Sequence, residues 1–211
     1  MLLMFTLIIF IFCSVALLLY TSGDHYFSGF FKMFASTGFI VLCVYMGGIQ
    51  SRYGLAILTG LFFSWWGDLF LISKSSAIFM VGLVAFFLAH VVYCAAFFYV
   101  GAALLEIMIA AGLLLIPAAI LVHWLYPYLG SMRWPVFAYI AVISLMTAVA
   151  ASAAYSSGRY LIILGAICFY CSDIFVARER FVVEQKTNQR VGLPLYYLAQ
   201  ILLAITVDYA R

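Results

Sequence analysis

The chain has 211 residues, of which 69% are hydrophobic and only 8% are charged, against about 25% charged in an ordinary soluble domain. This composition excludes a soluble globular protein and predicts an integral membrane protein. The net charge of +3 is small and dispersed along the chain, so it gives no indication of a nucleic-acid partner. We interpret the basic residues instead as determinants of membrane topology.

Eight apolar segments are long enough to cross a bilayer, which requires about 20 residues at 1.5 Å each. They cover residues 2–20, 30–49, 54–73, 77–99, 102–123, 135–154, 159–178 and 192–209. We interpret the first as a retained span, because it lacks the basic start and cleavage site of a signal peptide. The longest connection, 179–191, is polar and too short for a domain. The fold class is therefore an all-α, eight-helix membrane domain covering residues 1–211.

Prolines mark the expected ends and irregularities of these spans. Pro135 and Pro194 lie near the starts of the sixth and eighth spans, where a missing N–H costs little. Pro117 lies inside the fifth span and is expected to bend it.

The distribution of basic residues predicts the orientation. An even number of spans places both termini on one side of the membrane. The loops on the opposite side carry seven basic residues, namely Lys32, Lys74, Arg133, Arg178, Arg180, Lys186 and Arg190, against three on the terminal side, namely Arg52, Arg159 and Arg211. Because positive loops stay in the cytoplasm, we expect both termini on the non-cytoplasmic side of a bacterial inner (cytoplasmic) membrane.

Two aspartates lie inside apolar spans. Asp68 is in GLFFSWWGDLFLI (60–72) and Asp173 is in GAICFYCSDIFVA (165–177). An ionisable group at membrane depth is energetically costly and is by default a functional candidate. Each acid lies five residues before the expected cytoplasmic end of its span, or about 8 Å inside that boundary. The two carboxyl groups are therefore expected at the same depth.

The surroundings of the two acids resemble each other. Each acid follows a glycine by eight residues and precedes a phenylalanine by two, namely Gly60, Phe70, Gly165 and Phe175. The sequence FFLAHVVY at 86–93 also parallels YYLAQILL at 196–203. These similarities predict a 4+4 parallel repeat, residues 1–101 and 102–211, related by an axis along the membrane normal.

Such a repeat would bring the two carboxyl groups together as a catalytic pair. Two carboxyl groups held close in a dry site cannot both ionise easily, so they share a proton and one acts as acid while the other acts as base. The structural alternative is that each acid pairs with a base such as Lys32 and holds helices together. The sequence does not assign the acid and base roles between Asp68 and Asp173.

Other polar residues are candidates for positioning substrate or water. His90 and Tyr93 share one helix face and either orient the attacking water or join helices. Gln200 aligns with His90 in the repeat and has the same two interpretations. Lys32 either binds a lipid phosphate near the cytoplasmic boundary or extends its amine to the interface.

Cysteine and histidine patterns indicate no cofactor. All five cysteines lie in apolar spans, and an odd number there argues against a disulfide framework. Cys168 and Cys171 form a CxxC pair, interpreted as two small apolar side chains of one helix. The three histidines lack the spacing of a metal site. We expect neither a metal nor an organic cofactor.

Four motifs closely resemble those of the YhhN family, which includes the transmembrane lysoplasmalogenases. They are GDL at 67–69, FxxGLxxFxxAHxxY at 79–93, GAxxFxxSD at 165–173 and YLAQ at 197–200. The resemblance covers essentially the whole chain and implies an eight-spanning fold. It maps the family's intramembrane aspartates onto Asp68 and Asp173. Ser172 and Tyr197 join the positioning candidates because these motifs include them.

The resemblance also implies a reaction. It implies hydrolysis of the vinyl ether of a lysoplasmalogen (lysoplasmenylcholine or lysoplasmenylethanolamine) to a fatty aldehyde and a glycerophosphocholine or glycerophosphoethanolamine. The partners are then a lysophospholipid substrate and the bilayer. A pair of carboxyl groups suits this acid-catalysed chemistry, as in glycosidases, whose transition state is also oxocarbenium-like.

Three alternative functions are considered. An intramembrane aspartyl protease also uses two helix-borne aspartates, and LPL at 193–195 faintly resembles its proline motif, but Asp68 follows WWG rather than GxG. A lipid or proton-coupled transporter would explain the buried acids and the repeat, but no paired Gly/Pro-broken spans occur at the repeat positions. A zinc-dependent amidase is disfavoured by the scattered histidines.

Overall fold

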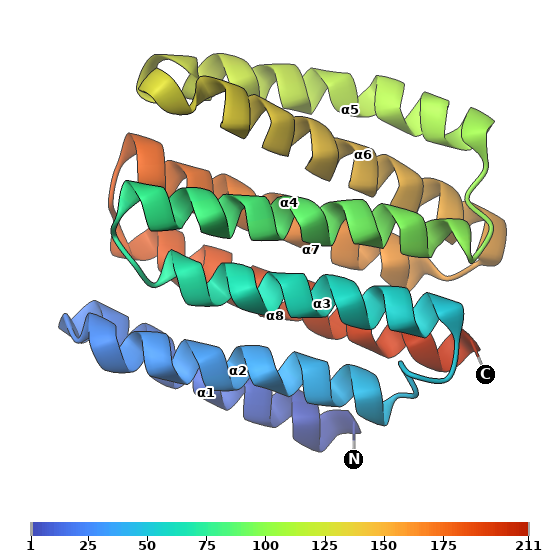
Figure 1. Ribbon diagram of the computed structural model, residues 1–211, viewed down its shortest axis with the longest axis horizontal. Coiled ribbons are helices and arrows are strands. Elements are labelled where there is room, and N and C mark those ends of the chain that lie inside the picture. The colour runs from blue at the N-terminus through green and yellow to red at the C-terminus, as the bar shows by residue number, and fades with distance from the viewer. Residues whose placement is uncertain (1, 211) are drawn as a thin grey trace.

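The computed structural model describes residues 2–210, which form helices joined by short connections (Figure 1). The long helices are α1 Leu2–Ser22, α2 His25–Tyr45, α3 Arg52–Leu71, α4 Ser76–Phe98, α5 Leu104–Leu125, α6 Arg133–Ser157, α7 Tyr160–Ala177 and α8 Lys186–Ile205. The short ones are η1 Tyr126–Tyr128, η2 Gly130–Met132, the π-helix η3 Arg178–Val182, and η4 Thr206–Ala210. Eight of these segments, with their short extensions, are long and apolar enough to cross a bilayer, so the protein is an all-α integral membrane protein, as predicted.

The helices lie side by side as an elongated bundle (Figure 1). Consecutive helices pair as α1 with α2, α3 with α4, α5 with α6, and α7 with α8. Helix α6 also packs against α4 and α7, and α8 packs against α1, α2 and α3. Helix α5 lies at one edge and packs mainly on α6 (Figure 1). Helix α1 begins, and η4 ends, at the same end of the bundle, as an even number of crossings requires.

Glycines allow α3 and α4 to approach closely. A Cβ atom added at Gly60 would lie 2.3 Å from the ring of Tyr93, and one at Gly67 would lie 2.5 Å from the ring of Phe86. Only hydrogen therefore fits between these rings and the α3 backbone. The close contact fixes the position of α3, which carries Asp68, relative to α4, which carries His90.

The outer surface of the bundle suits hydrocarbon. Helix α5 exposes a row of large apolar side chains, namely Leu104, Leu105, Met108, Ile109, Leu113, Leu115, Ile116 and Ile120. In water such a surface would be an aggregation liability. In a bilayer it faces lipid at no cost, while polar side chains such as Asp68, His90 and Gln200 are buried inside the bundle.

The predicted spans are confirmed in number, but two of their starts were placed wrongly. Helix α2 begins at His25, so Lys32 lies well inside that helix rather than opening it. Helix α8 begins at Lys186, which makes most of the expected connection 179–191 helical and puts Pro194 in the helix interior. Hydropathy detects the stretch that crosses hydrocarbon, whereas a helix can continue as polar turns beyond it.

Candidate active site

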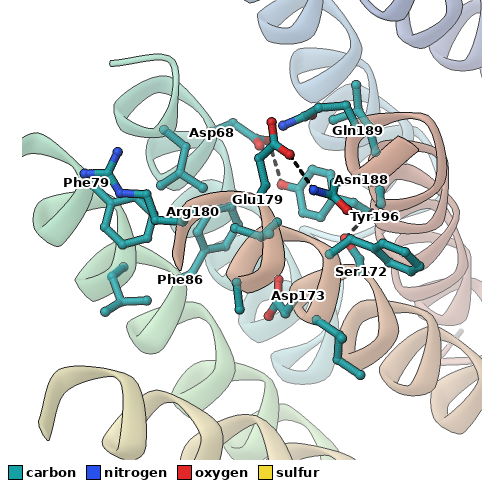
Figure 2. Close-up of a pocket in the computed structure, with 18 of the residues that line it drawn as sticks. Asp68, Phe79, Phe86, Ser172, Asp173, Glu179, Arg180, Asn188, Gln189 and Tyr196 are labelled. Atoms are coloured by element: carbon teal, nitrogen blue, oxygen red, sulfur yellow. Dashed lines mark hydrogen bonds between the residues drawn. The ribbon is translucent and has the colours of Figure 1, made fainter. Parts of the chain in front are cut away.

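Asp68 and Asp173 both line one cavity of about 490 Å³ inside the bundle (Figure 2). All eight long helices contribute residues to its wall. Most of this wall is apolar, with aliphatic side chains from α5 and α6 and aromatic rings from α4 and α8. The two aspartates and Lys32 therefore lie beside apolar wall, and further charged residues line the cavity near the ends of α3 and α7. The space is large enough for part of a lipid.

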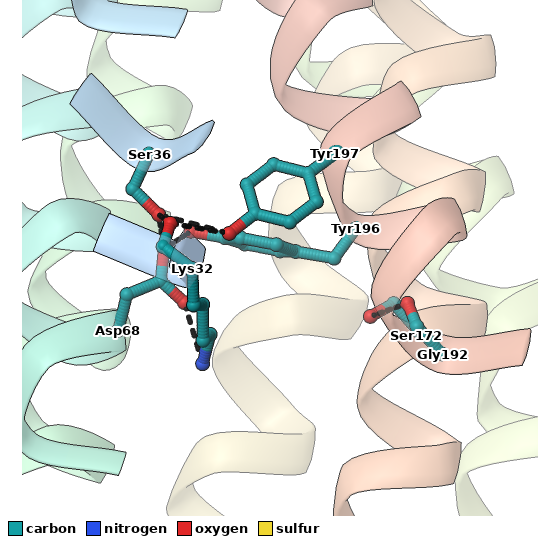
Figure 3. Close-up of polar contacts among 7 residues, drawn as sticks. All are labelled: Lys32, Ser36, Asp68, Ser172, Gly192, Tyr196 and Tyr197. Carbon is teal, nitrogen blue, oxygen red and sulfur yellow. Dashed lines mark hydrogen bonds and ion pairs between the residues drawn. The ribbon is translucent and has the colours of Figure 1, made fainter. Parts of the chain in front are cut away.

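Asp68 is held by three donors from two other helices (Figure 3). The Lys32 amine lies 3.0 Å from Oδ1, and the hydroxyl groups of Ser36 and Tyr196 donate to Oδ2 at 2.7 and 2.6 Å. Only 1% of Asp68 is exposed. A buried carboxylate persists as an anion when a positive charge and hydrogen bonds compensate its desolvation. Asp68 therefore carries its negative charge as part of an ion pair.

Helix geometry explains why these donors converge on Asp68. Lys32 and Ser36 are four residues apart on α2 and so share one face of that helix. Tyr197, the neighbour of Tyr196 on α8, donates its hydroxyl to the backbone oxygen of Lys32 at 2.8 Å. The same hydroxyl lies 3.2 Å from Ser36 Oγ (Figure 3). Tyr197 therefore fixes the α2 segment that presents both partners of Asp68.

Asp173 has a different environment, with fewer hydrogen-bond donors in contact with its carboxyl group. The Tyr139 hydroxyl donates to Oδ2 at 2.6 Å, and His90 Nε2 lies 3.0 Å from the Tyr139 oxygen and 3.6 Å from Oδ2. His90 is fully buried, whereas 16% of the Asp173 side chain is exposed to the cavity. Because the single hydroxyl proton of Tyr139 goes to Asp173, His90 Nε2 must be the donor to Tyr139. His90 thus positions Tyr139, and Tyr139 positions Asp173.

The two carboxyl groups do not share a proton directly, contrary to the expectation from the sequence. Within residues 2–210 no hydrogen bond joins them, and each accepts from its own tyrosine. Figure 2 shows them at separate places on the cavity wall. A series of ring contacts connects them: Tyr196 packs on Phe169 with 5.5 Å between centroids, and Phe169 packs on His90 at 4.6 Å. The site is therefore two acids on one wall, each with its own hydrogen-bond network.

Three other residues expected to position substrate or water join helices instead. Tyr93 donates to Gln200 Oε1 at 2.9 Å, linking α4 to α8 in the core, and neither residue lines the cavity. This is the structural alternative that the sequence left open. Ser172 does line the cavity, but its hydroxyl donates to the backbone oxygen of Gly192 at 3.0 Å, which links α7 to α8 beside Asp173.

Three hydroxyl groups that contact the acids were not among the predicted site residues. They belong to Ser36, Tyr139 and Tyr196. Ser36 carried a usable signal, since it lies one helical turn after Lys32.

Within residues 2–210, no group of three or more His, Cys, Asp or Glu side chains is arranged to hold a metal ion.

Comparison with known proteins finds a matching family model and two similar proteins. A family model described as the YhhN family matches residues 27–207. The chain is 30% identical over 163 residues to a Bos taurus protein named lysoplasmalogenase TMEM86A, and 31% identical over 162 residues to the Homo sapiens protein of the same name. Each match covers 74% of this chain and 66% of the relative, so it spans slightly less than two-thirds of the relatives' length. No solved structure matches the chain.

Proposed function

The chain belongs to the YhhN family, and from this premise we propose that it is an intramembrane hydrolase that cleaves the vinyl ether bond of lysoplasmalogens. The products are a fatty aldehyde and a glycerophospho-headgroup compound. The observation that carries this proposal is the apolar cavity with two aspartates in different environments on its wall. The apolar wall suits an alkenyl chain, and the two acids suit the chemistry at its end. The names of the two mammalian relatives support the same substrate class.

Vinyl ether hydrolysis needs a proton donor, a base and nearby negative charge. The donor protonates the alkenyl carbon distal to the ether oxygen, which leaves an oxocarbenium ion. Water adds to the carbon bonded to that oxygen and loses a proton to the base. In the hemiacetal, the hydroxyl group then loses its proton, the bond to the glycerol oxygen breaks as that oxygen takes up a proton, and the aldehyde is released. Glycosidases use two carboxyl groups for a similar transition state.

The different environments of the two acids support one assignment of the two roles. Asp173 is the proposed proton donor, because its Oδ2 accepts from Tyr139 and part of its carboxyl group faces the cavity. In residues 2–210 no lysine or arginine forms an ion pair with it, in contrast to Asp68 with its Lys32 partner. Its other oxygen, Oδ1, can then hold the proton toward substrate.

Asp68 is the proposed base and stabilising anion. Its pairing with Lys32 and two hydroxyl groups keeps it charged before substrate arrives. A fixed negative charge in a dry site stabilises a developing cation strongly. Ser36, Tyr196 and Tyr197 then act as positioning residues for Asp68, and His90 acts in the same way on Asp173 through Tyr139.

The helix contacts support the proposed 4+4 repeat. If α1–α4 are superposed in order on α5–α8, the α2·α3 contact corresponds to α6·α7 and the α2·α8 contact to α6·α4. The acids follow the same relation. Asp68 on α3 bonds to residues of α2 and α8, and Asp173 on α7 bonds to Tyr139 of α6 and lies beside His90 of α4.

We also propose that the end of the bundle opposite the α1 start faces the cytoplasm of a bacterium. The α3–α4 connection and η3 lie there, and they supply Lys74, Arg178 and Arg180. Positive residues retained on the cytoplasmic side would place both termini outside it. A cysteine-accessibility experiment in intact inner-membrane vesicles tests this orientation with Lys186→Cys and with Tyr160→Cys, which replaces a side chain that is 67% exposed at the start of α7 on the terminal side. Labelling of Lys186→Cys and Tyr160→Cys from opposite faces, with Lys186→Cys on the cytoplasmic one, is expected, and the reverse would overturn the orientation.

The function is tested by incubating the purified protein with lysoplasmenylethanolamine and measuring the fatty aldehyde released. Wild-type protein should release it, whereas Asp173→Asn and Asp68→Asn should not. Asp24→Asn is the matched control, because Asp24 caps α2 and does not line the cavity, and asparagine caps a helix equally well. Retained activity in both site variants would end the mechanism. Peptide cleavage without aldehyde would favour an aspartyl protease, and transport of unchanged lipid would favour a transporter.

A further inference from the structure

The cavity is lined at one end by charged side chains that the proposed chemistry does not use. Lys74 comes from the connection between α3 and α4, while Glu179, Arg180 and Glu184 follow the end of α7. Asp68 and Asp173 lie deeper, within the transmembrane helices α3 and α7. A lipid whose alkenyl chain occupies the apolar part of the cavity would therefore leave its polar end among these charges.

Arg180 is fixed in place beside the cavity. Its Nη1 donates to the backbone oxygen of Lys74 at 3.2 Å, and its Nη2 donates to Ser76 Oγ at 3.0 Å. The guanidinium carbon lies 4.5 Å from the centre of the Phe79 ring (Figure 2), within cation–π range. These two bonds use two of the five N–H groups of arginine. A planar guanidinium held in this way is well suited to bind a phosphate through two parallel hydrogen bonds.

The two glutamates differ in availability. Glu179 accepts from the Tyr20 hydroxyl at 2.7 Å and from the Gln185 backbone N–H at 2.9 Å, and it also accepts from Asn188. Its carboxylate is thus used to hold α1, η3 and the start of α8 together. Glu184 forms only a 3.4 Å contact with Lys74, and both side chains are largely exposed, at 65% and 73%. This exposed pair presents both signs of charge next to Arg180 and can open at little cost.

The spacing between Arg180 and Asp173 matches the substrate. Arg180 follows Asp173 by seven residues along α7 and η3, a rise of about 10 Å. In a lysoplasmalogen, seven bonds separate the alkenyl carbon that is protonated from the phosphorus atom. At about 1.2 Å per bond, as in an extended chain, they span roughly 8 Å. A phosphate at Arg180 therefore leaves the alkenyl carbon near the level of Asp173.

We propose that Arg180 and Lys74 bind the phosphate of the lysolipid headgroup and that Glu184 contacts its ammonium group. This proposal rests on the proposed function, and it corrects the expectation that Lys32 binds phosphate, because the Lys32 amine is paired with Asp68. The headgroup site selects zwitterionic lysophospholipids and contributes to their binding.

The test compares two substrates that differ only in the phosphate. Lysoplasmenylethanolamine and the phosphate-free alkenylglycerol are assayed in the same micelles with wild type, Arg180→Gln, Arg180→Lys and Arg190→Gln. Arg180→Gln should raise KM for the phospholipid by about 10- to 100-fold, the usual effect of losing a charge-assisted bond, and leave kcat and the alkenylglycerol reaction unchanged. Arg180→Lys should lie between. Arg190→Gln, on an exposed α8 residue outside the cavity, should match wild type.

Further measurements separate the competing explanations. An equal loss on both substrates would mean that Arg180 only holds the structure, and an unchanged KM would remove the phosphate site. Glycerophosphoethanolamine should inhibit the wild type competitively, whereas equal inhibition by inorganic phosphate would overturn the assignment to a headgroup. Glu184→Gln should raise KM several-fold for the ethanolamine lipid but not for the same lipid without ethanolamine.

The headgroup site and the proposed function can fail separately. If wild type releases no aldehyde from either substrate, the proposed function fails. Binding of a non-hydrolysable alkyl-ether lysophosphoethanolamine then tests the site alone. Weaker binding by Arg180→Gln but not by Arg190→Gln supports the site, and equal binding by both variants overturns it.

Discussion

The ion pair between Lys32 and Asp68 makes a quantitative prediction about stability. At 3.0 Å and an effective dielectric constant near 20, the attraction between the two charges is about 5.5 kcal/mol. Desolvation offsets much of this, so the net value of the pair is small. Removing one partner, however, leaves the other charge unpaired inside the bundle, where the side chains of Asp68 and Lys32 are only 2% and 19% exposed. Lys32→Met and Asp68→Asn should each lower the free energy of unfolding by about 3 kcal/mol.

The double variant distinguishes this reasoning from simple loss of contacts. Lys32→Met/Asp68→Asn leaves no uncompensated charge, so it should be no less stable than either single variant. The assay is equilibrium unfolding in mixed micelles, with Lys74→Met as a control that breaks a largely exposed pair and should cost less than about 1 kcal/mol. If the two single losses add, to about 6 kcal/mol in the double variant, the buried pair is not coupled and Asp68 need not be an anion.

Other predictions concern single groups of the site and its packing. Tyr139→Phe removes the hydroxyl that donates to Asp173, and should lower kcat about 100-fold with little change in KM; an unchanged kcat would remove Tyr139 from the mechanism. Gly67→Ala places a Cβ atom 2.5 Å from the Phe86 ring and should destabilise the fold by about 1–3 kcal/mol in unfolding experiments. Gly112→Ala, with open space around it, should instead stabilise α5 by up to about 1 kcal/mol. Chelators should leave aldehyde release intact, and a chelator-sensitive rate restored by zinc would contradict the proposed chemistry.

Composition and hydropathy were sufficient to predict the membrane fold and the number of spans, because lipid exposure imposes a continuous apolar run on each helix. They could not place helix ends such as Lys186, since polar turns outside the hydrocarbon carry no hydropathy signal. The cost of buried charge was enough to single out Asp68 and Asp173, and both line the cavity.

The partners of those acids were harder to predict, because they depend on which helices become neighbours. Tyr139 is one of 15 tyrosines, and only the packing of α6 against α7 identifies it. The expected proton shared between the acids was wrong for the same reason. The sequence suggested that Lys32 is near Asp68, and the spacing of Ser36 one turn after Lys32 was a usable signal. Nothing in the sequence indicated that Tyr196 of α8 would also bond to Asp68.

The central claim is that Asp173 delivers a proton to carbon, and isotopic analysis of the product tests it most directly. With lysoplasmenylethanolamine in D₂O, the aldehyde released by the wild type should carry one deuterium on the carbon next to the carbonyl group, and Asp173→Asn should release none of this product while still folding. Aldehyde without deuterium, or a labelled product formed equally fast by Asp173→Asn, would contradict the account.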